Sequence, residues 1–162
     1  MSKWEYRADE VKHLLNPAFC GRVIYGTVTE YQKKTKRDFP YPLTYLILPL
    51  VLPRQIRTKI NSRTQFPNWV QNHQEFIFNF WKRAKDLVEI TNEAVEFMLQ
   101  TGYMKLTDNG ELSKDFETGA LSKSKYSDVE VDDCLVKAEN VGRWFATTGR
   151  IETIFISLGV RP

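Results

Sequence analysis

The longest apolar run of the chain, residues 43–52, sets the strongest limit on its fold. A helix that crosses a membrane needs about 20 apolar residues, which this run does not reach, and it also contains Pro49. It is apolar on every side of a helix, which indicates a buried helix rather than a surface one. Because a proline inside a helix removes a backbone hydrogen bond, we expect a kink or a break at Pro49.

The size and composition of the chain are those of one folded domain. It has 162 residues, of which 42% are hydrophobic and 27% are charged, values typical of a globular protein with one core. Aromatic residues make up 13% and include four Trp and ten Phe. This share predicts either a large core or a surface that binds other proteins, and the sequence leaves both open.

The two cysteines and the first residues bear on where the protein resides. Cys20 and Cys134 lie far apart in helix-like surroundings, which favours two buried, reduced thiols in a reducing compartment. The N-terminal residues lack the charged, apolar and small-residue regions of a secretory signal. We therefore expect a soluble, cytoplasmic protein with no membrane contact.

Capping residues and apolar spacing predict most of the helices. Asn16 can cap a helix that Pro17 opens. This helix is expected to run to about residue 32, where the cations at 33–37 favour its end. Thr91 favours the start of another helix and Gly102 its end. Further helices are expected over 53–60, 66–70, 76–90, 131–145 and 151–158.

Gly142 inside a helix costs about 1 kcal/mol relative to Ala, so we expect close helix packing there.

One short stretch predicts β-structure. Residues 103–107 alternate in hydropathy and precede Asn109-Gly110, a pair that strongly favours a hairpin. A helix, a glycine and a hairpin follow one another in winged helix-turn-helix modules, and the polar residues 113–127 are expected to form a loop. The predicted fold class is mainly α with a small β-hairpin, a winged-helix-like module with packed N- and C-terminal helices. We expect a single domain over 1–162, with a helical core at 17–101, a wing-like hairpin at 103–112 and C-terminal helices at 128–158.

The residues that catalysis needs are sparse. His13 and His73 are the only histidines, and neither stands near a cysteine or paired carboxylates at metal-ligand spacing. The chain also lacks the glycine-rich phosphate loop with its Lys and Ser or Thr. The sequence therefore predicts a protein that is not an enzyme and that needs neither a cofactor nor a metal.

Charge is distributed unevenly, although the formal net charge is only +3. Residues 31–64 hold eight basic residues and one acid, and residues 107–133 hold eight acids and three lysines. Such asymmetry is typical of a protein that meets an anionic partner on one face and a basic partner on another. Two solvated faces would give the same pattern.

Four cations within ten residues form a candidate contact for an anion: Arg54, Arg57, Lys59 and Arg63. They can contact the backbone of double-stranded DNA without reading its sequence, or an acidic patch on a protein. A solvated face is the alternative. Reading a DNA sequence would need basic or amide side chains on the helix that enters the major groove. The helix expected in that position carries Glu93 and Glu96 and no basic residue, which favours a winged helix used for protein contacts.

A second candidate contact lies near the C-terminal end. Arg143, Trp144 and Arg161 are predicted to belong to a protein interface, because Trp and Arg are the residue types that most often anchor interfaces. The alternative is that Trp144 fills the core and Arg143 pairs locally.

Several short motifs together resemble a known family, the middle component of three-component ABC-ATPase systems, whose best-known relatives are Lamassu-type antiphage systems. In chain order the motifs are Asn16-Pro17-Ala18-Phe19, Leu48-Pro49-Leu50-Val51-Leu52, Arg57, Glu93-Ala94, Gly142-Arg143-Trp144-Phe145 and Gly159-Val160-Arg161-Pro162. Pro53 departs from the family pattern, which often has a histidine there. The resemblance implies a winged-helix adaptor that couples an SMC-like ABC ATPase, the sensor of foreign DNA, to an effector subunit that is often a nuclease.

A free-standing winged-helix transcription regulator is the alternative function. The acidic helix at 91–101 and the lack of a dimerisation heptad speak against it. The sequence thus favours a non-catalytic adaptor subunit of a defence complex.

Overall fold

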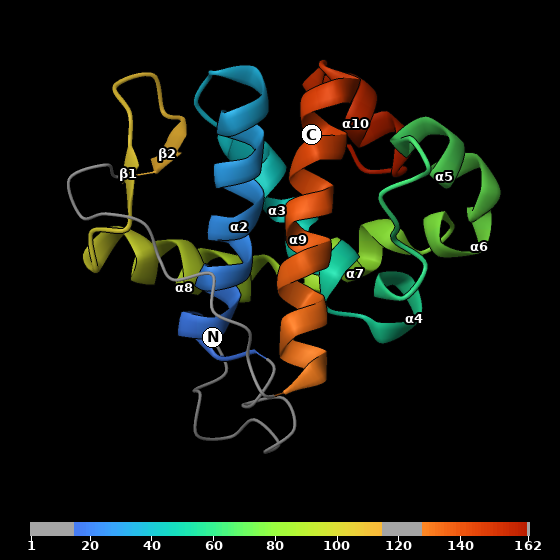
Figure 1. Cartoon of the computed structure of the whole chain (residues 1–162), viewed down its shortest axis with the longest axis horizontal. Helices are drawn as coiled ribbons and strands as arrows, with labels where there is room; N and C mark the ends of the chain where they lie inside the picture. The colour runs from blue at the N-terminus through green and yellow to red at the C-terminus, as the bar shows by residue number, and fades with distance from the viewer. Residues whose placement is uncertain (1–14, 115–127, 162) are drawn as a thin grey trace.

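The computed structural model describes residues 15–114 and 128–161, and helices dominate it. Helices α2 (Pro17–Thr35) and α9 (Val129–Thr148) lie side by side, and α8 (Val88–Gln100) crosses α2 (Figure 1). Behind them lies α3 (Thr44–Val51), preceded by the 3-10 turn η2 (Tyr41–Leu43). The fold class predicted from the sequence, mainly α with a small hairpin, is confirmed for these residues.

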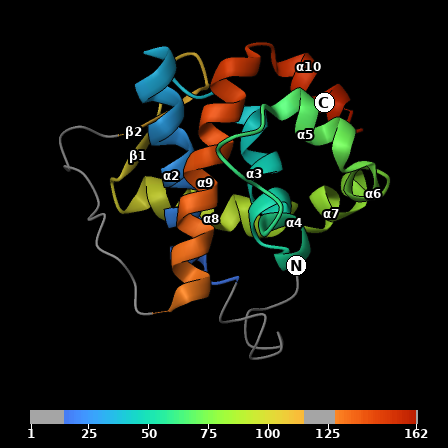
Figure 2. The same cartoon turned by 45° about the vertical axis from the view of Figure 1, so that its right-hand side comes forward.

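The remaining elements lie on either side of the α2–α9 pair. The hairpin of β1 (Met104–Leu106) and β2 (Leu112–Lys114) lies beside α2. The opposite side holds the short helices, which Figure 2 brings forward: α4 (Arg54–Arg57), α5 (Phe66–Asn72), α6 (Gln74–Ile77), α7 (Phe80–Asp86) and α10 (Ile151–Ser157). Among the described helices, none has both the length and the apolar character that crossing a membrane requires.

The start of α2 follows from its cap. The Asn16 side chain accepts hydrogen bonds from the backbone N–H groups of Ala18, at 2.7 Å, and Phe19, at 3.4 Å, and Pro17 occupies the first turn. This confirms the predicted N-cap. The helix ends at Thr35, three residues later than expected, where Lys36 takes a left-handed conformation with φ +59°.

Most of the apolar run at residues 43–52 forms helix α3. Its residues Leu46, Ile47, Leu48, Leu50 and Val51 are fully buried, which confirms the predicted buried helix. The helix is not broken at Pro49 and continues to Val51. Pro49 has no backbone N–H to donate, yet the chain keeps its helical conformation on both sides of it.

The single helix predicted over 76–90 is wrong. The chain turns at residues 78–79 and again at Leu87, so three helices replace it, and α8 begins before Thr91 rather than at it. The physical reason is that the apolar residues of this segment do not share one buried face. Phe80 and Ala84 reach the core, whereas Phe78 is 81% and Trp81 50% exposed.

The hairpin predicted around Asn109-Gly110 is confirmed. Its strands pair antiparallel from Met104–Lys114 to Leu106–Leu112, and Gly110 has the positive φ of +75° that the turn requires. Phe39 exchanges backbone hydrogen bonds with Leu112 and ties the hairpin to the core. The predicted loop over 113–127 is wrong at its start, because Ser113 belongs to β2 and is buried; residues 115–127 lie outside the described residues.

The close helix packing expected at Gly142 is confirmed. A Cβ at this position would lie 2.5 Å from the backbone oxygen of Thr27 on α2. The Thr27 hydroxyl donates a 2.8 Å hydrogen bond to the carbonyl oxygen of Ala138, one turn earlier on α9. Glycine therefore lets the backbones of α2 and α9 approach each other directly, which fixes the centre of the fold.

Candidate functional site

An apolar groove opens where the start of α3, helices α7 and α8 and the C-terminal segment meet. Its volume is about 880 Å³. The walls are mainly apolar or aromatic and include Tyr41, Tyr45, Trp81, Val88, Phe155 and Val160. We call this feature the apolar groove. It draws on three stretches that are far apart in the sequence, residues 41–46, 81–88 and 155–161.

The aromatic side chains of the groove are held in place by local contacts. The rings of Tyr41 and Tyr45 lie edge to face, with 6.0 Å between their centroids. The Tyr45 hydroxyl donates a 2.6 Å hydrogen bond to the side-chain oxygen of Asn92 on α8. Burial, and then the neighbouring Tyr45, raise the pKa of Tyr41 above its usual value. This phenol is therefore neutral at physiological pH, and it adds no charge to the wall.

Part of the apolar surface of the groove faces solvent. The indole of Trp81 is 50% exposed, and Val88, the first residue of α8, is exposed as well. A half-exposed Trp beside a concave apolar surface is the arrangement that anchors partner side chains in protein interfaces.

Positive charge borders the groove. Lys85 and Arg161 are the charged residues among those that line it, and both are exposed. Among the described residues neither forms an ion pair with a carboxylate. No carboxylate, imidazole or thiol from residues 15–114 and 128–161 lines the groove. The groove can therefore bind an apolar group beside a negative charge.

The second structural feature is a buried ionic cluster around Arg57, which is only 2% exposed. Its guanidinium donates to Glu130 at 2.8 Å, to Asp133 at 3.1 Å, and to the carbonyl oxygens of Val51 at 3.1 Å and Leu52 at 2.7 Å. We call Arg57, Glu130 and Asp133 the ionic clasp. It ties the C-terminal end of α3 to the first turns of α9.

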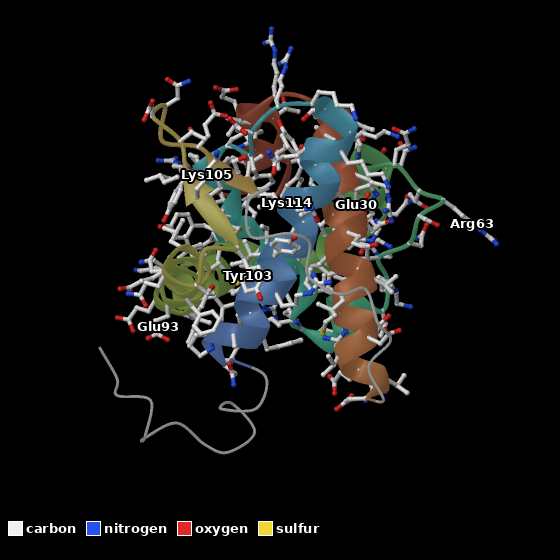
Figure 3. All side chains as sticks on the ribbon, turned by 60° about the vertical axis from the view of Figure 1, so that its left-hand side comes forward. Glu30, Arg63, Glu93, Tyr103, Lys105 and Lys114 are labelled. Carbon is white, nitrogen blue, oxygen red and sulfur yellow. The ribbon has the colours of Figure 1, made fainter. Side chains whose placement is uncertain are left out.

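The four cations predicted to form one basic contact therefore do not share one surface. Arg54, Lys59 and Arg63 are exposed, and Figure 3 shows Arg63 projecting away from the protein. Arg57 does not belong with them, and the expectation that it contacts an external anion is corrected. Its donors are already used by two carboxylates and two backbone carbonyls within the fold.

The three residues predicted at a C-terminal interface also lie in different surroundings. Trp144 is 4% exposed, packs against Phe66 and Trp69 and donates from its indole to the carbonyl oxygen of Thr64. Arg143 is partly exposed and lies 3.3 Å from Glu30 on α2. For Trp144 the alternative of core packing describes the structure, and the interface expectation is corrected. Arg143 makes the local pair that was its alternative, and its place in an interface stays a prediction. Arg161 alone reaches the apolar groove.

The aromatic residues of the groove were not predicted as a site. Helical spacing puts Trp81 on the core side of an amphipathic helix, and the prolines around Tyr41 indicate a mere spacer. The high share of aromatic residues was the one indication of this site in the sequence, because it allowed for a surface that binds proteins. Within the described residues, no group of three or more His, Cys, Asp or Glu side chains comes together as a metal site.

The chain belongs to the family described as ABC-three component (ABC-3C) system Middle Component 3, whose model matches residues 4–162. This confirms the resemblance to middle components of three-component ABC systems. No curated protein matches the chain. No solved structure matches it. A middle component of a three-component system has partner subunits. The groove is therefore a candidate surface for binding one of them.

Proposed function

We propose that this chain is a non-catalytic adaptor of a cytoplasmic antiphage complex of the Lamassu type. It would couple an SMC-like ABC ATPase, which senses DNA, to an effector nuclease. The observation that carries the proposal is the family match over residues 4–162, which makes the chain the middle one of three components. An adaptor must bind other subunits, and the apolar groove supplies a surface suited to that task.

The described residues support binding rather than catalysis. The apolar groove is lined mainly by aromatic and aliphatic side chains, together with two cations. Both cysteines are buried, and burial raises the pKa of Cys134 to about 11. A thiol in that state is a poor nucleophile. These properties fit a subunit whose activity is the assembly of the complex.

The exposed cations after α3 are proposed as a contact for an anion, either the DNA backbone or an acidic patch on the ATPase. They are Arg54, Lys59 and Arg63, and we call them the basic surface. Contact with DNA phosphates would be indifferent to sequence and would weaken steeply with salt.

The unit formed by α8, Gly102 and the hairpin is proposed to act as a winged-helix-like module for protein contacts. The order of its elements matches such a module. The exposed side of α8 carries Glu89 and Glu96, and these carboxylates would be repelled by DNA phosphates. This charge favours the adaptor over a free-standing DNA-binding regulator.

Co-expression with the ATPase and the effector of the same three-component system tests the adaptor role. We expect one complex on size-exclusion chromatography that contains all three chains. ATPase and nuclease activity should be lost on active-site substitutions in the partners. A wild-type chain that purifies without either partner would refute the adaptor role. A substitution in this chain that abolishes ATP hydrolysis while the complex stays assembled would refute the non-catalytic role.

The basic surface is tested by the triple variant Arg54→Glu, Lys59→Glu and Arg63→Glu. Arg57 is left unchanged because its side chain is buried. We expect the variant complex to bind DNA more weakly and with a smaller dependence on salt. The slope of log affinity against log salt should shrink by about one for each phosphate that the protein no longer neutralises. If loss of ATPase binding without DNA is observed instead, the anion lies on the ATPase. Unchanged binding in both assays would identify a solvated face.

A further inference from the structure

We infer that the apolar groove receives an amphipathic helix from another subunit of the complex, with apolar side chains in the groove and a carboxylate beside Lys85 and Arg161. The inference rests on the proposed function, because it needs the partner subunits. It goes further in naming the surface of this chain that is used and the chemistry of the segment that it binds.

The shape of the groove favours a helix over an extended strand. Its walls come from helical elements and from the segment after α10. No edge of the β1–β2 hairpin, the sheet found among the described residues, contributes to it. An extended peptide gains affinity by adding its backbone to a sheet edge, which is not available here. A helix instead anchors through side chains one turn apart, which suits a groove of about 880 Å³.

The charges at the groove favour a carboxylate on the partner. Lys85 lies on α7 and Arg161 on the C-terminal segment, so the two cations approach the groove from different elements. Because no acidic residue of the described segments lines the groove, both cations can pair with an incoming carboxylate. Pairs of this kind mainly steer association and fix the orientation of the partner.

The same charges disfavour a second copy of this chain. In a symmetric dimer each surface meets its own copy. Two such grooves would therefore bring Lys85 and Arg161 against the same cations of the other protomer, and like charges in an interface oppose binding. A partner with opposite charge avoids this repulsion.

Substitutions at exposed groove residues test the inference in the three-component complex. Trp81→Ala removes the half-exposed anchor, and Lys85→Glu with Arg161→Glu reverses the bordering charge. We expect the first variant to weaken assembly by roughly 10-fold or more, as for the loss of an interface Trp. The second should slow association, and added salt should then speed it instead of slowing it, because salt screens the repulsion between like charges.

Matched controls carry the same chemistry outside the groove. Phe78→Ala removes an aromatic residue that is 81% exposed but does not line the groove. Lys105→Glu with Arg150→Glu reverses two exposed cations elsewhere, on the hairpin and before α10. Both controls should assemble like the wild type, and all variants should keep the wild-type thermal unfolding midpoint.

A photo-crosslinking residue in place of Val88 identifies the occupant within the assembled complex. The crosslinked peptide should come from another subunit, with apolar residues at helical spacing and at least one acidic residue. A crosslink to a second copy of this chain, or lipid found in the groove by mass spectrometry, would overturn the inference. So would groove variants that assemble as tightly as the controls, while the adaptor role would stand. If the wild type itself forms no complex, the adaptor role fails first.

Discussion

Replacing Arg57 with methionine should destabilise the fold much more than any change to the exposed cations nearby. Methionine keeps most of the length of the side chain but removes its charge and all its donors. The carbonyl oxygens of Val51 and Leu52 at the end of α3 would be deprived of hydrogen bonds of 3.1 and 2.7 Å. Glu130 and Asp133 would be deprived of the cation that holds the start of α9 against that end.

The magnitude follows from how buried each group is. A buried polar group left without a partner costs about 1–3 kcal/mol, and two carbonyls are affected. Loss of the cation beside the two carboxylates costs less free energy, because water can solvate them. The Glu130 side chain is 46% exposed and that of Asp133 is 34% exposed. We therefore expect a loss of about 3–5 kcal/mol, the range for removing one partner of a buried ion pair. At about 2–4 °C per kcal/mol for a domain of this size, the midpoint of thermal unfolding should fall by roughly 6–20 °C.

Urea unfolding followed by tryptophan fluorescence measures this loss as a shift of the transition midpoint at constant slope. Arg54→Met is the matched control, since the same substitution on the same short helix removes an exposed cation. It should change the free energy of unfolding by no more than about 0.5 kcal/mol. Equal stability of the two variants would show that the ionic clasp does not hold α3 to α9.

Further predictions concern other buried positions. Gly142→Ala should destabilise the protein by about 1–3 kcal/mol in urea unfolding, because the added methyl would lie 2.5 Å from a backbone oxygen of α2. Gly26→Ala on the facing helix meets no atom closer than 3.6 Å and should be stabilising by about 0.5–1 kcal/mol. Thr91→Val should leave the melting temperature unchanged or raise it, because the buried Thr91 hydroxyl has no hydrogen-bond partner among the described residues. Cys134 should react with a thiol reagent at pH 8 only after unfolding, since burial raises its pKa to about 11 and the thiolate is the reactive form.

Features that depend on neighbouring residues were predictable from the sequence. The Asn16 cap needs only the N–H groups of the first turn, and the turn at Gly110 needs only a residue that tolerates positive φ. The burial of α3 followed from its composition. Even the contact at Gly142 could be expected, because a glycine that weakens a long helix requires compensation.

Features that depend on distant residues were not predictable in the same way. Arg57 and Arg54 look alike in the sequence, yet the partners of Arg57 stand 73 and 76 residues further along the chain. The break at residues 78–79 likewise reflects which apolar residues the core accepts and not local helix preference. The groove combines three stretches that are far apart in the sequence, 41–46, 81–88 and 155–161, so the aromatic residues that line it carried no local signal.

The high aromatic share allowed either a large core or a binding surface, and the structure uses aromatic residues for both. Phe66, Trp69 and Trp144 pack together in the core, whereas Tyr45 and Trp81 line the groove. Helix α3 connects the groove to the ionic clasp, because Tyr45 in its first turn lines the groove and the carbonyl oxygen of Val51, its last residue, accepts from Arg57. A partner that binds only the folded groove would therefore stabilise the whole fold by mass action, about 2.7 kcal/mol at 100 times its dissociation constant. The ionic clasp and the partner would then support the same helix from opposite ends.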